Sequence, residues 1–286
     1  MEGVRVKQEL WGLRTMSMVE HYINNMFGDI FIGKIHLLAE GCDYWSYLSE
    51  SNYVIRVPKN PRAQTHLQFE MAKLPLLTLP LAVPRYIRTF GRVGIYPVIP
   101  GESADLGRIP GDDMVARLAQ FLEALHRETH LSPQTRTIRG PKRWLKRFRR
   151  LHDEVADKVY PLLRVKEQRR CRQRFQDLFH ALDSVPWSCT LIHGDLSLEH
   201  ILIDQGEIAG VIDFGDMSAG DPAYDLSGIS PRWEKGRLED YATRLDPWGR
   251  RHLYRWAAPL HDILYGLDEG NVESVEQALE KFRKGS

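Results

Sequence analysis

The feature that most limits the possible folds of this 286-residue chain is a change of hydropathy pattern near residues 96–101. Before it, short β-branched and aromatic runs are separated by Gly, Asp and Asn turns, which is typical of antiparallel strands. After it, apolar residues recur with helical spacing, most clearly at 114–128. The sequence therefore predicts an α+β fold with a β-rich lobe, residues 1–100, and a mostly helical lobe, residues 101–286. A hinge at about 96–101 joins the two lobes.

Local signals predict the individual elements. Strands are expected at 31–39, 44–48, 53–57, 85–90, 94–99, within 190–204 and at 208–214. Helices are expected at 17–27, 66–77, 114–128, 141–165 and 166–182, and again from 238 onward. Asp112 or Asp113 is the expected N-cap of the helix at 114–128, because a short carboxylate accepts hydrogen bonds from the first helical N–H groups.

Composition and termini exclude several classes of protein. The richest apolar stretch, residues 74–83, contains two prolines and is too short for a membrane span, which needs about 20 residues. Acidic residues interrupt the first 30 positions, so we expect no secretory signal and a cytoplasmic protein. Three scattered cysteines predict neither a disulfide framework nor a CxxC metal site. We expect a monomer.

The net charge of +1 conceals two opposed blocks. Residues 139–174 carry 14 basic and 4 acidic side chains, whereas residues 175–286 carry 10 basic and 20 acidic side chains. A solvated helix face is the simpler interpretation of the basic block, and a nucleic acid or another anionic partner is the alternative. No zinc finger or RNA-recognition signature supports that alternative, so we expect no nucleic-acid partner and no membrane partner. The acidic block could attract a cation.

The segment at 191–225 carries the chemistry. Asp195 follows an apolar run and Gly194, and Asp213 follows Val211 and Ile212. A tight Gln205-Gly206 turn predicts a hairpin that can bring Asp195, His200 and Asp213 to one cleft. Mg²⁺ prefers oxygen ligands and substrate phosphates, which suits Asp213. Asp195 suits a base that accepts a hydroxyl proton.

This segment closely resembles the aminoglycoside phosphotransferase family, which has a two-lobed protein-kinase-like fold. The resemblance is carried by three motifs: His193-Gly194-Asp195, Ile212-Asp213-Phe214 and Gly220-Asp221-Pro222-Ala223-Tyr224-Asp225. It implies that Asp195 is the catalytic base, that Asp213 binds Mg²⁺, and that Asp221 and Asp225 brace the catalytic loop. Most members have Asn where this chain has His200. Macrolide and aminoglycoside 2''-phosphotransferases also carry His there, and a neutral imidazole can bind a metal, so we retain His200 as a ligand.

The resemblance extends to the first lobe. Residues 39–43 match the loop that covers the nucleotide, and Arg56 stands on the strand where kinases place a phosphate-binding Lys. Glu70 matches the acid that pairs with this cation, and Lys59 is a lower-ranked second cation. Val98 and Ile99 match the hinge that binds the purine. Because proline has no N–H, a donor there must be Val98, Ile99 or Gly101, and we favour Ile99. The donor is ATP or GTP.

The expected reaction transfers a γ-phosphoryl group to a hydroxyl of a small cationic acceptor such as an aminoglycoside, the type of reaction that gives antibiotic resistance. Candidate acids that could face a polyamine are Glu199, Asp216, Glu234, Glu239, Asp240, Asp262, Asp268 and Glu269. Four aromatic residues could instead line a larger apolar pocket or pack between helices: Trp233, Tyr254, Trp256 and Tyr265. A macrolide or primary-metabolite kinase is therefore the alternative, and a non-catalytic kinase-like binding module is a further one.

Overall fold

The computed structural model describes residues 16–26, 33–90, 93–105, 107, 109–128, 140–184 and 186–285. The chain divides into two compact units. The first consists of Met1–Ala104 and Glu199–Met217, and the second of Asp105–Leu198 and Ser218–Ser286. Thus the segment Glu199–Met217, which carries His200 and Asp213, groups with the N-terminal part of the chain. The simpler division into lobes 1–100 and 101–286 stays a prediction.

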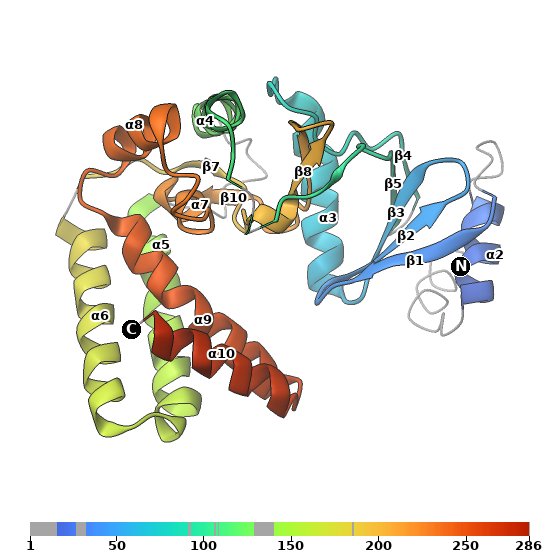
Figure 1. Cartoon of the computed structure of the whole chain (residues 1–286). Coiled ribbons are helices and arrows are strands. Elements are labelled where there is room, and N and C mark those ends of the chain that lie inside the picture. Colours follow the sequence, from blue (N-terminus) through green and yellow to red (C-terminus); the bar gives the residue numbers. More distant parts are fainter. Residues whose placement is uncertain are drawn as a thin grey trace. The chain divides into compact units, whose positions relative to one another are not determined.

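A five-stranded antiparallel sheet in the order β1-β2-β3-β5-β4 forms the body of the first unit (Figure 1). Its strands are β1 (Ile35–Glu40), β2 (Tyr44–Ser49), β3 (Tyr53–Pro58), β4 (Arg88–Phe90) and β5 (Val93–Pro97). The helix α2 (Met16–Met26) packs on one face through Val19 and Ile23, in a cluster that includes Tyr47 and Ile55. Tyr44 packs with α3 (Pro61–Lys73) on the other face, because side chains alternate along a strand.

Local sequence signals explain where helix α3 begins and where the β8–β9 hairpin turns. The side chain of Asn60 caps α3 by accepting a hydrogen bond from the Ala63 N–H at 2.9 Å, so the helix begins at Pro61, five residues before the predicted start. It is followed by a 3₁₀ turn at Leu74–Leu76. The hairpin of β8 (Ile201–Asp204) and β9 (Glu207–Val211) turns at Gln205 and Gly206, whose φ angles are 48° and 89°. The predicted hairpin is confirmed, and β6 (Glu102–Ser103) adds a third strand.

Helices make up most of the second unit. They are α4 (Asp112–His126), α5 (Gly140–Glu154), α6 (Val165–Ser184), α7 (Ala223–Ser227), α8 (Gly236–Leu245), α9 (Arg250–Asp268) and α10 (Val272–Lys284). The short strands β7 (Thr190–Ile192) and β10 (Ser218–Gly220) pair antiparallel. The apolar face predicted for α4 is buried as expected. Its N-cap was predicted wrongly: Gly111 has the extended conformation of a cap, and Asp112 and Asp113 lie in the first turn.

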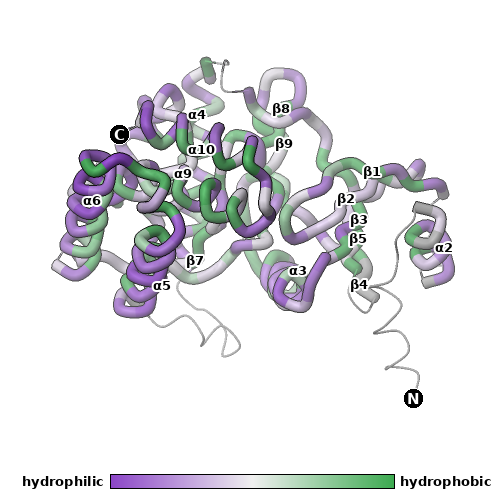
Figure 2. The backbone as a smooth tube through the Cα atoms, turned by 90° about the horizontal axis from the view of Figure 1, so that it is seen from below, coloured by the Kyte–Doolittle hydropathy of each residue, from purple (hydrophilic) through white to green (hydrophobic). Residues whose placement is uncertain are grey.

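A large core of aliphatic and aromatic side chains from α5, α6, α9 and α10 holds this unit together. The helix predicted at 141–165 is shorter in the structure: α5 ends at Glu154 and continues as a π turn, Val155–Val159, and a 3₁₀ turn, Tyr160–Leu162. The chain then reverses into α6. Figure 2 draws much of α5 and α6 in the colour of hydrophilic residues, with the apolar positions on their inner side. No helix in the described ranges is long and apolar enough to cross a membrane.

Candidate active site

Arg56 lies at the centre of a buried charge cluster in the first unit. It occupies β3 between Ser46 of β2 and Gly94 of β5, and only 3% of the residue is exposed. Its Nη1 donates to Glu70 Oε2 at 3.1 Å, and its Nη2 donates to Asp213 Oδ1 at 2.7 Å. One planar guanidinium therefore bridges α3 and the loop after β9. The fork of donors makes this possible, since a Lys ammonium in the same place is a single point charge.

Two tyrosines complete the cluster. The guanidinium carbon of Arg56 lies 4.0 Å from the ring centroid of Tyr44, and Tyr86 donates its hydroxyl hydrogen to Glu70 Oε1 at 2.8 Å. A Cβ at Gly94 would meet the Tyr86 ring at 2.6 Å, so the glycine leaves room for this tyrosine. No pattern in the sequence pointed to either tyrosine. The lower-ranked cation Lys59 lies elsewhere, paired with Glu40 at 2.8 Å.

Burial and charge oppose each other within this cluster. Burial works against the charge on Arg56, but the carboxylates of Asp213 and Glu70 outweigh it and raise the pKa of Arg56 above its ordinary value. Burial raises the pKa of Glu70 to about 7, although the positive charge of Arg56 acts in the opposite direction. The carboxylates thus stabilise the charge of Arg56, whereas burial disfavours the charge of Glu70.

His200 and Asp213 lie together beside this cluster. His200 Nε2 is 3.9 Å from Asp213 Oδ2, and the Ile212 N–H donates to the His200 carbonyl at 2.9 Å. Asp213 has a φ of 63°, and 42% of its side chain is exposed. No third His, Cys, Asp or Glu completes a metal cluster among the residues that the structure describes. Asp213 suits a Mg²⁺ ion that takes one carboxylate from the protein and other oxygens from phosphates and water, and metal binding by His200 stays a prediction.

The hinge residues Val98 and Ile99 differ in what their backbones can offer. The Val98 N–H already donates to the Asn52 carbonyl at 2.9 Å, so Val98 is not available as a purine donor. The sequence could not show this, because the bond depends on the loop between β2 and β3. Ile99 makes no such bond in the described part of the chain, and its side chain packs against Gly210 of β9. The structure therefore favours Ile99 over Val98.

Asp195 belongs to the second unit, on a loop held by its neighbours. The His193 Nδ1 accepts a hydrogen bond from the Asp195 N–H at 3.3 Å. The buried carboxylate of Asp225 accepts bonds from the N–H groups of His193 at 2.8 Å and Gly194 at 2.9 Å. The predicted bracing role of Asp225 is confirmed by these bonds. The Asp195 residue itself is exposed, and its approach to His200 and Asp213 stays a prediction.

A third donor to Asp225 comes from α4. His126 Nε2 lies 3.0 Å from Asp225 Oδ2, and its Nδ1 lies 2.6 Å from the Tyr241 hydroxyl. Burial alone would raise the pKa of Asp225, but the hydrogen bond and charge of His126 and the positive character of His193 lower it below its ordinary value. Because Asp225 is an anion, His126 Nε2 donates its hydrogen to it, and Nδ1 shares a hydrogen bond with the Tyr241 hydroxyl. His126, at the end of an apolar helix face, was not predicted.

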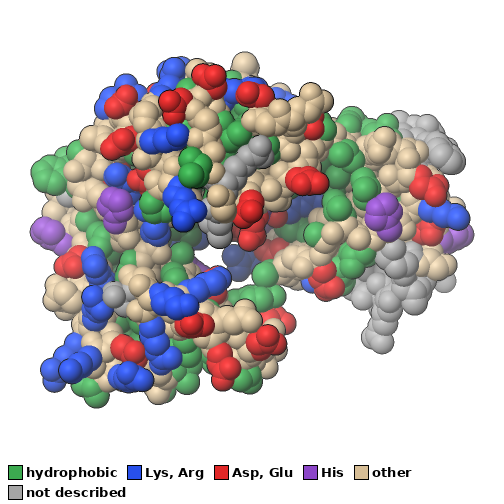
Figure 3. All heavy atoms as spheres, in the orientation of Figure 1, with side chains coloured by type: hydrophobic (Ala, Val, Ile, Leu, Met, Phe, Trp, Pro, Cys, Tyr) green, Lys and Arg blue, Asp and Glu red, His purple; other side chains and the backbone are tan. Residues whose placement is uncertain are grey.

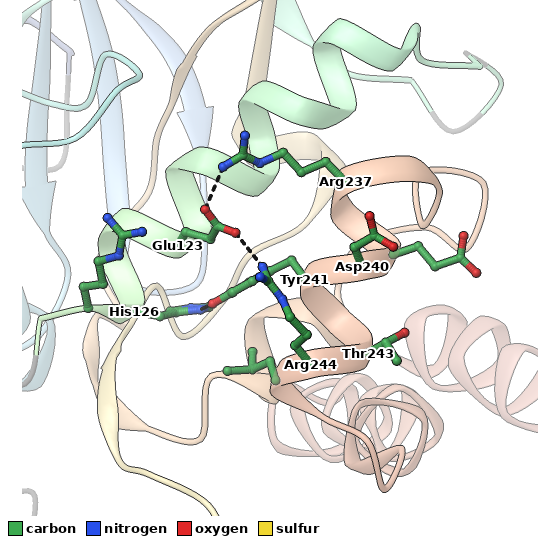
Figure 4. A pocket seen from close by; sticks show the side chains of 10 residues that line it. Glu123, His126, Arg237, Asp240, Tyr241, Thr243 and Arg244 are labelled. Carbon is green, nitrogen blue, oxygen red and sulfur yellow. Dashed lines mark hydrogen bonds and ion pairs between the residues drawn. The ribbon is translucent and has the colours of Figure 1, made fainter.

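His126 and Tyr241 line a cavity of about 1050 Å³ between α4 and α8 (Figure 4). Figure 4 shows the two side chains pointing toward each other from the two helices. On the same wall, Glu123 accepts hydrogen bonds from Arg237 and Arg244, each at 2.9 Å. These pairs lower the pKa of Glu123, although burial opposes them. The contacts fix α8 against α4 and thereby the far end of the hydrogen-bond chain that supports the loop of Asp195.

Asp221 has a different part in the fold from Asp225. It accepts hydrogen bonds from Arg250 Nε at 2.6 Å and from the Tyr254 hydroxyl at 2.9 Å, both on α9. Asp246 Oδ1 accepts a further bond from the Arg250 N–H. All of these side chains are buried. Asp221 thus links the start of α7 to α9, and its bracing of the catalytic loop stays a prediction.

The structure also shows which candidates for acceptor binding are already paired or buried within the protein. Three of the eight acids are engaged in ion pairs: Glu234 with Arg251 and Arg255, Asp262 with Lys281, and Asp268 with Lys158. Three of the four aromatic candidates are buried in the protein, namely Trp233, Tyr254 and Trp256, and Tyr265 is exposed. Helix packing is therefore the correct interpretation of those three, and the acidic block is partly neutralised within the chain.

Comparison with known proteins identifies the family. Residues 38–267 match the model of the phosphotransferase enzyme family, abbreviated APH. The chain belongs to this family. The matched range contains the Arg56 cluster, the hinge, the loop of Asp195 and the β8–β9 hairpin, which confirms the resemblance drawn from the three motifs.

Three relatives illustrate the range of this phosphotransferase family. Viomycin phosphotransferase from Streptomyces vinaceus is 28% identical over 123 residues, which are 39% of this chain and only 42% of that relative. The GDP complex of aminoglycoside 2'-phosphotransferase-IIIa superposes with a TM-score of 0.80 at 24% identity, covering 95% of this chain and 98% of that one. The macrolide 2'-phosphotransferase MphH from Brachybacterium faecium gives 0.66 at 20% identity, covering 91% and 96%. The two solved structures share the two-lobed kinase-like fold predicted for this chain.

Proposed function

We propose that this phosphotransferase transfers the γ-phosphoryl group of ATP or GTP to a hydroxyl of a cationic, aminoglycoside-like acceptor. The observation that carries the proposal is the buried Arg56, which is bound to Glu70 and to Asp213 at the same time. A kinase needs a fixed cation for the nucleotide phosphates and a carboxylate for the metal beside it. The cluster of Arg56, Glu70 and Asp213 supplies both groups, and it occurs in a chain that belongs to a phosphotransferase family.

Each part of the first unit has a role in holding the donor. Ile99 offers its N–H to the base, Arg56 neutralises phosphate oxygens, and Glu70 fixes the position of the guanidinium. Asp213 and His200 would hold Mg²⁺, which when bound supplies charge neutralisation for the phosphates. Arg56 donates a hydrogen bond directly to Asp213. When the nucleotide binds, we expect its phosphate oxygens to accept part of the hydrogen bonding that Arg56 now gives to Asp213. Residues 1–100 accordingly form the core of the nucleotide-binding lobe.

Asp195 orients the acceptor and receives its proton. The His193 and Gly194 N–H groups donate to the Asp225 carboxylate and so hold the loop, so that the exposed carboxylate of Asp195 is positioned before the acceptor arrives. Rate enhancement then comes chiefly from orientation and from neutralised charge, and less from covalent chemistry. The relatives named for viomycin and aminoglycosides support a cationic acceptor, and the burial of Trp233 and Trp256 speaks against an aromatic macrolide pocket built on them.

The test is acceptor-dependent release of nucleoside diphosphate. The purified protein is incubated with Mg²⁺, ATP or GTP, and a panel of aminoglycosides, viomycin-like peptides, macrolides and metabolites. Asp195→Asn should abolish turnover and leave nucleotide affinity nearly unchanged, since Asp195 does not contact the donor in this scheme. Asp204→Asn, at the far end of β8, is the matched control and should remain active. Absence of turnover with every acceptor would contradict the proposal.

His200 needs its own measurement, because histidine is an uncommon Mg²⁺ ligand. His200→Ala should raise the Mg²⁺ concentration required for half-maximal turnover, and His200→Asn should restore it, since an amide oxygen can replace the imidazole. If the Mg²⁺ requirement of His200→Ala equals that of the wild-type protein, His200 does not bind the metal.

A further inference from the structure

The basic block of the sequence forms one surface of the second unit. Ten exposed basic side chains belong to it, six on α5 and four on α6: Lys142, Arg143, Lys146, Arg147, Arg149, Arg150, Lys166, Arg169, Arg170 and Arg172. We call this set the basic face. In Figure 3, Lys and Arg side chains gather over α5 and α6. Along α5 most of them occupy the side opposite the buried Trp144, Phe148 and Leu151. The guanidinium of Arg147 is the exception, because it lies 5.0 Å from the centre of the Trp144 ring.

The charges of the basic face are not neutralised within the chain. None of the ten side chains pairs with a carboxylate in the part of the chain that the structure describes. The basic residues of α8, α9 and α10 behave differently, because Arg237, Arg250 and Arg283 each bind a carboxylate. Within the second unit, these Arg side chains of α8, α9 and α10 therefore form ion pairs with carboxylates, whereas those of the basic face on α5 and α6 remain available to a ligand.

A groove between α5 and α6 gives this surface a defined shape. It measures about 560 Å³, and the basic side chains that line it are Lys142, Lys146, Arg149 and Arg150. Asp153 and Asp183 also line it, so the bases outnumber the acids by two to one. The guanidinium of Arg149 lies 6.0 Å from the ring of Phe179 on α6, which shows how closely the two helices approach each other. An extended anion could follow such a groove and contact the row of α5 cations that lines it.

The chemistry of the basic face favours phosphates over a membrane. A helix binds a lipid surface by inserting its apolar side, but the apolar side of α5 is already buried in the core. Seven of the ten side chains are Arg, whose fork of donors matches phosphate oxygens in a bidentate manner. No exposed aromatic ring lies on the described residues of α5 or α6, so stacking on single-stranded bases is not available. A nucleic-acid duplex fits such a surface, because its phosphate backbone can be bound by arginines and its stacked bases need no aromatic partner.

The width of the surface distinguishes between the two kinds of duplex. Two packed helices with their side chains are about 20 Å wide, whereas the major groove of B-DNA is about 12 Å wide and admits a single helix. The minor groove of A-form RNA is wide and shallow and is recognised through phosphates and 2'-hydroxyl groups. We propose that the basic face of α5 and α6 binds the backbone of an RNA duplex without reading its sequence, in contrast to the absence of a nucleic-acid partner that the sequence alone led us to expect. This inference is independent of the proposed kinase activity.

The experiment measures the binding of full-length protein to a fluorescent RNA duplex of about 20 base pairs, somewhat longer than the roughly 16 that double-stranded RNA-binding domains span. Anisotropy is recorded between about 50 and 200 mM salt. The variant Lys146→Gln/Arg150→Gln removes two phosphate contacts with good helix formers and should lower the magnitude of the salt slope by about 2. The variant Lys146→Glu/Arg150→Glu should weaken binding further, by about tenfold or more at the lowest salt.

The control carries the same change of charge on another helix of the same unit. Lys281→Gln/Lys284→Gln on α10 should bind RNA as the wild-type protein does. The proposal is overturned if this control loses as much affinity as the α5 variants. It is equally overturned if the wild-type protein binds a DNA duplex of the same sequence, poly-glutamate or phosphatidylserine vesicles as tightly as RNA. Saturable binding that prefers RNA and is reduced only by the α5 variants supports it.

Discussion

Replacing His126 by alanine removes one of the three hydrogen bonds that the buried Asp225 carboxylate accepts, those from His126, His193 and Gly194. The remaining two come from the backbone of the loop that carries Asp195. Asp225 therefore stays buried with a smaller number of donors, and the Tyr241 hydroxyl loses its partner at 2.6 Å. We expect both the stability of the protein and the order of this loop to decrease.

The magnitude follows from the type of bond. A buried hydrogen bond to a charged group contributes about 1.5–3 kcal/mol, and the loss of the ring leaves a cavity. We expect His126→Ala to lower the free energy of unfolding by about 3 kcal/mol, which is a large part of the roughly 5–15 kcal/mol typical of a folded domain. Tyr241→Phe removes only the outer, neutral bond and should cost about 1 kcal/mol. His126→Gln keeps an amide donor and should recover part of the loss.

Two measurements test this reasoning. Urea denaturation gives the unfolding free energies of the three variants and the wild-type protein. Hydrogen exchange of the His193 and Gly194 amides reports on the loop directly, and both should exchange faster in His126→Ala. Turnover should fall, with nucleotide affinity nearly unchanged. If His126→Ala costs less than about 0.5 kcal/mol and leaves both amides protected, the hydrogen-bond chain does not support the loop.

Three further changes test other parts of the structure. Gly228→Ala places a Cβ 1.7 Å from the Leu196 carbonyl oxygen and should lower the melting temperature strongly, whereas Gly285→Ala, with only ordinary contacts, should not; equal melting temperatures would exclude the clash. Burial and the charge of Arg147 lower the pKa of His261 to about 4, so the unfolded state binds a proton more readily and stability should fall as the pH drops from about 6.5 to 4. His261→Leu should lose this dependence in denaturation curves, and a curve parallel to that of the wild-type protein would refute the assignment. Arg56→Lys keeps the charge but cannot bridge Glu70 and Asp213 together, and it should weaken nucleotide binding by about tenfold in a titration; unchanged affinity would show that the fork is not needed.

Much of the secondary structure could be predicted, because the spacing of apolar residues is a local property. Both α4 and the strands β2 and β3 lie within a few residues of their predicted bounds. The errors occurred at ends of elements. Asn60 started α3 earlier than the apolar pattern suggested, and Gly111 rather than an aspartate became the cap of α4. Caps depend on backbone conformation, which the side-chain pattern specifies only weakly.

The candidate site was predicted in part. Arg56 and Glu70 pair as expected, and His200 lies beside Asp213. Among the three possible purine donors, the Val98 N–H is already bound to Asn52 of a neighbouring loop, and the favoured donor Ile99 stays a prediction. His126 was missed because a single histidine at the end of an apolar helix face carries no pattern, and its function depends on Asp225, 99 residues away.

The sequence by itself determined the kinds of elements, the hairpin at Gln205 and Gly206, and the residues of the three motifs that placed the chain in its family. Tertiary structure alone decided which charges have partners. It joined Arg56 to Asp213 across 157 positions and neutralised acids of the C-terminal block. It left the exposed cations of α5 and α6 without a carboxylate partner among the residues that the structure describes. The physical reason is that the charge of a residue is set by its side chain, but its counterion is set by whatever the packing of distant segments brings within a few ångströms.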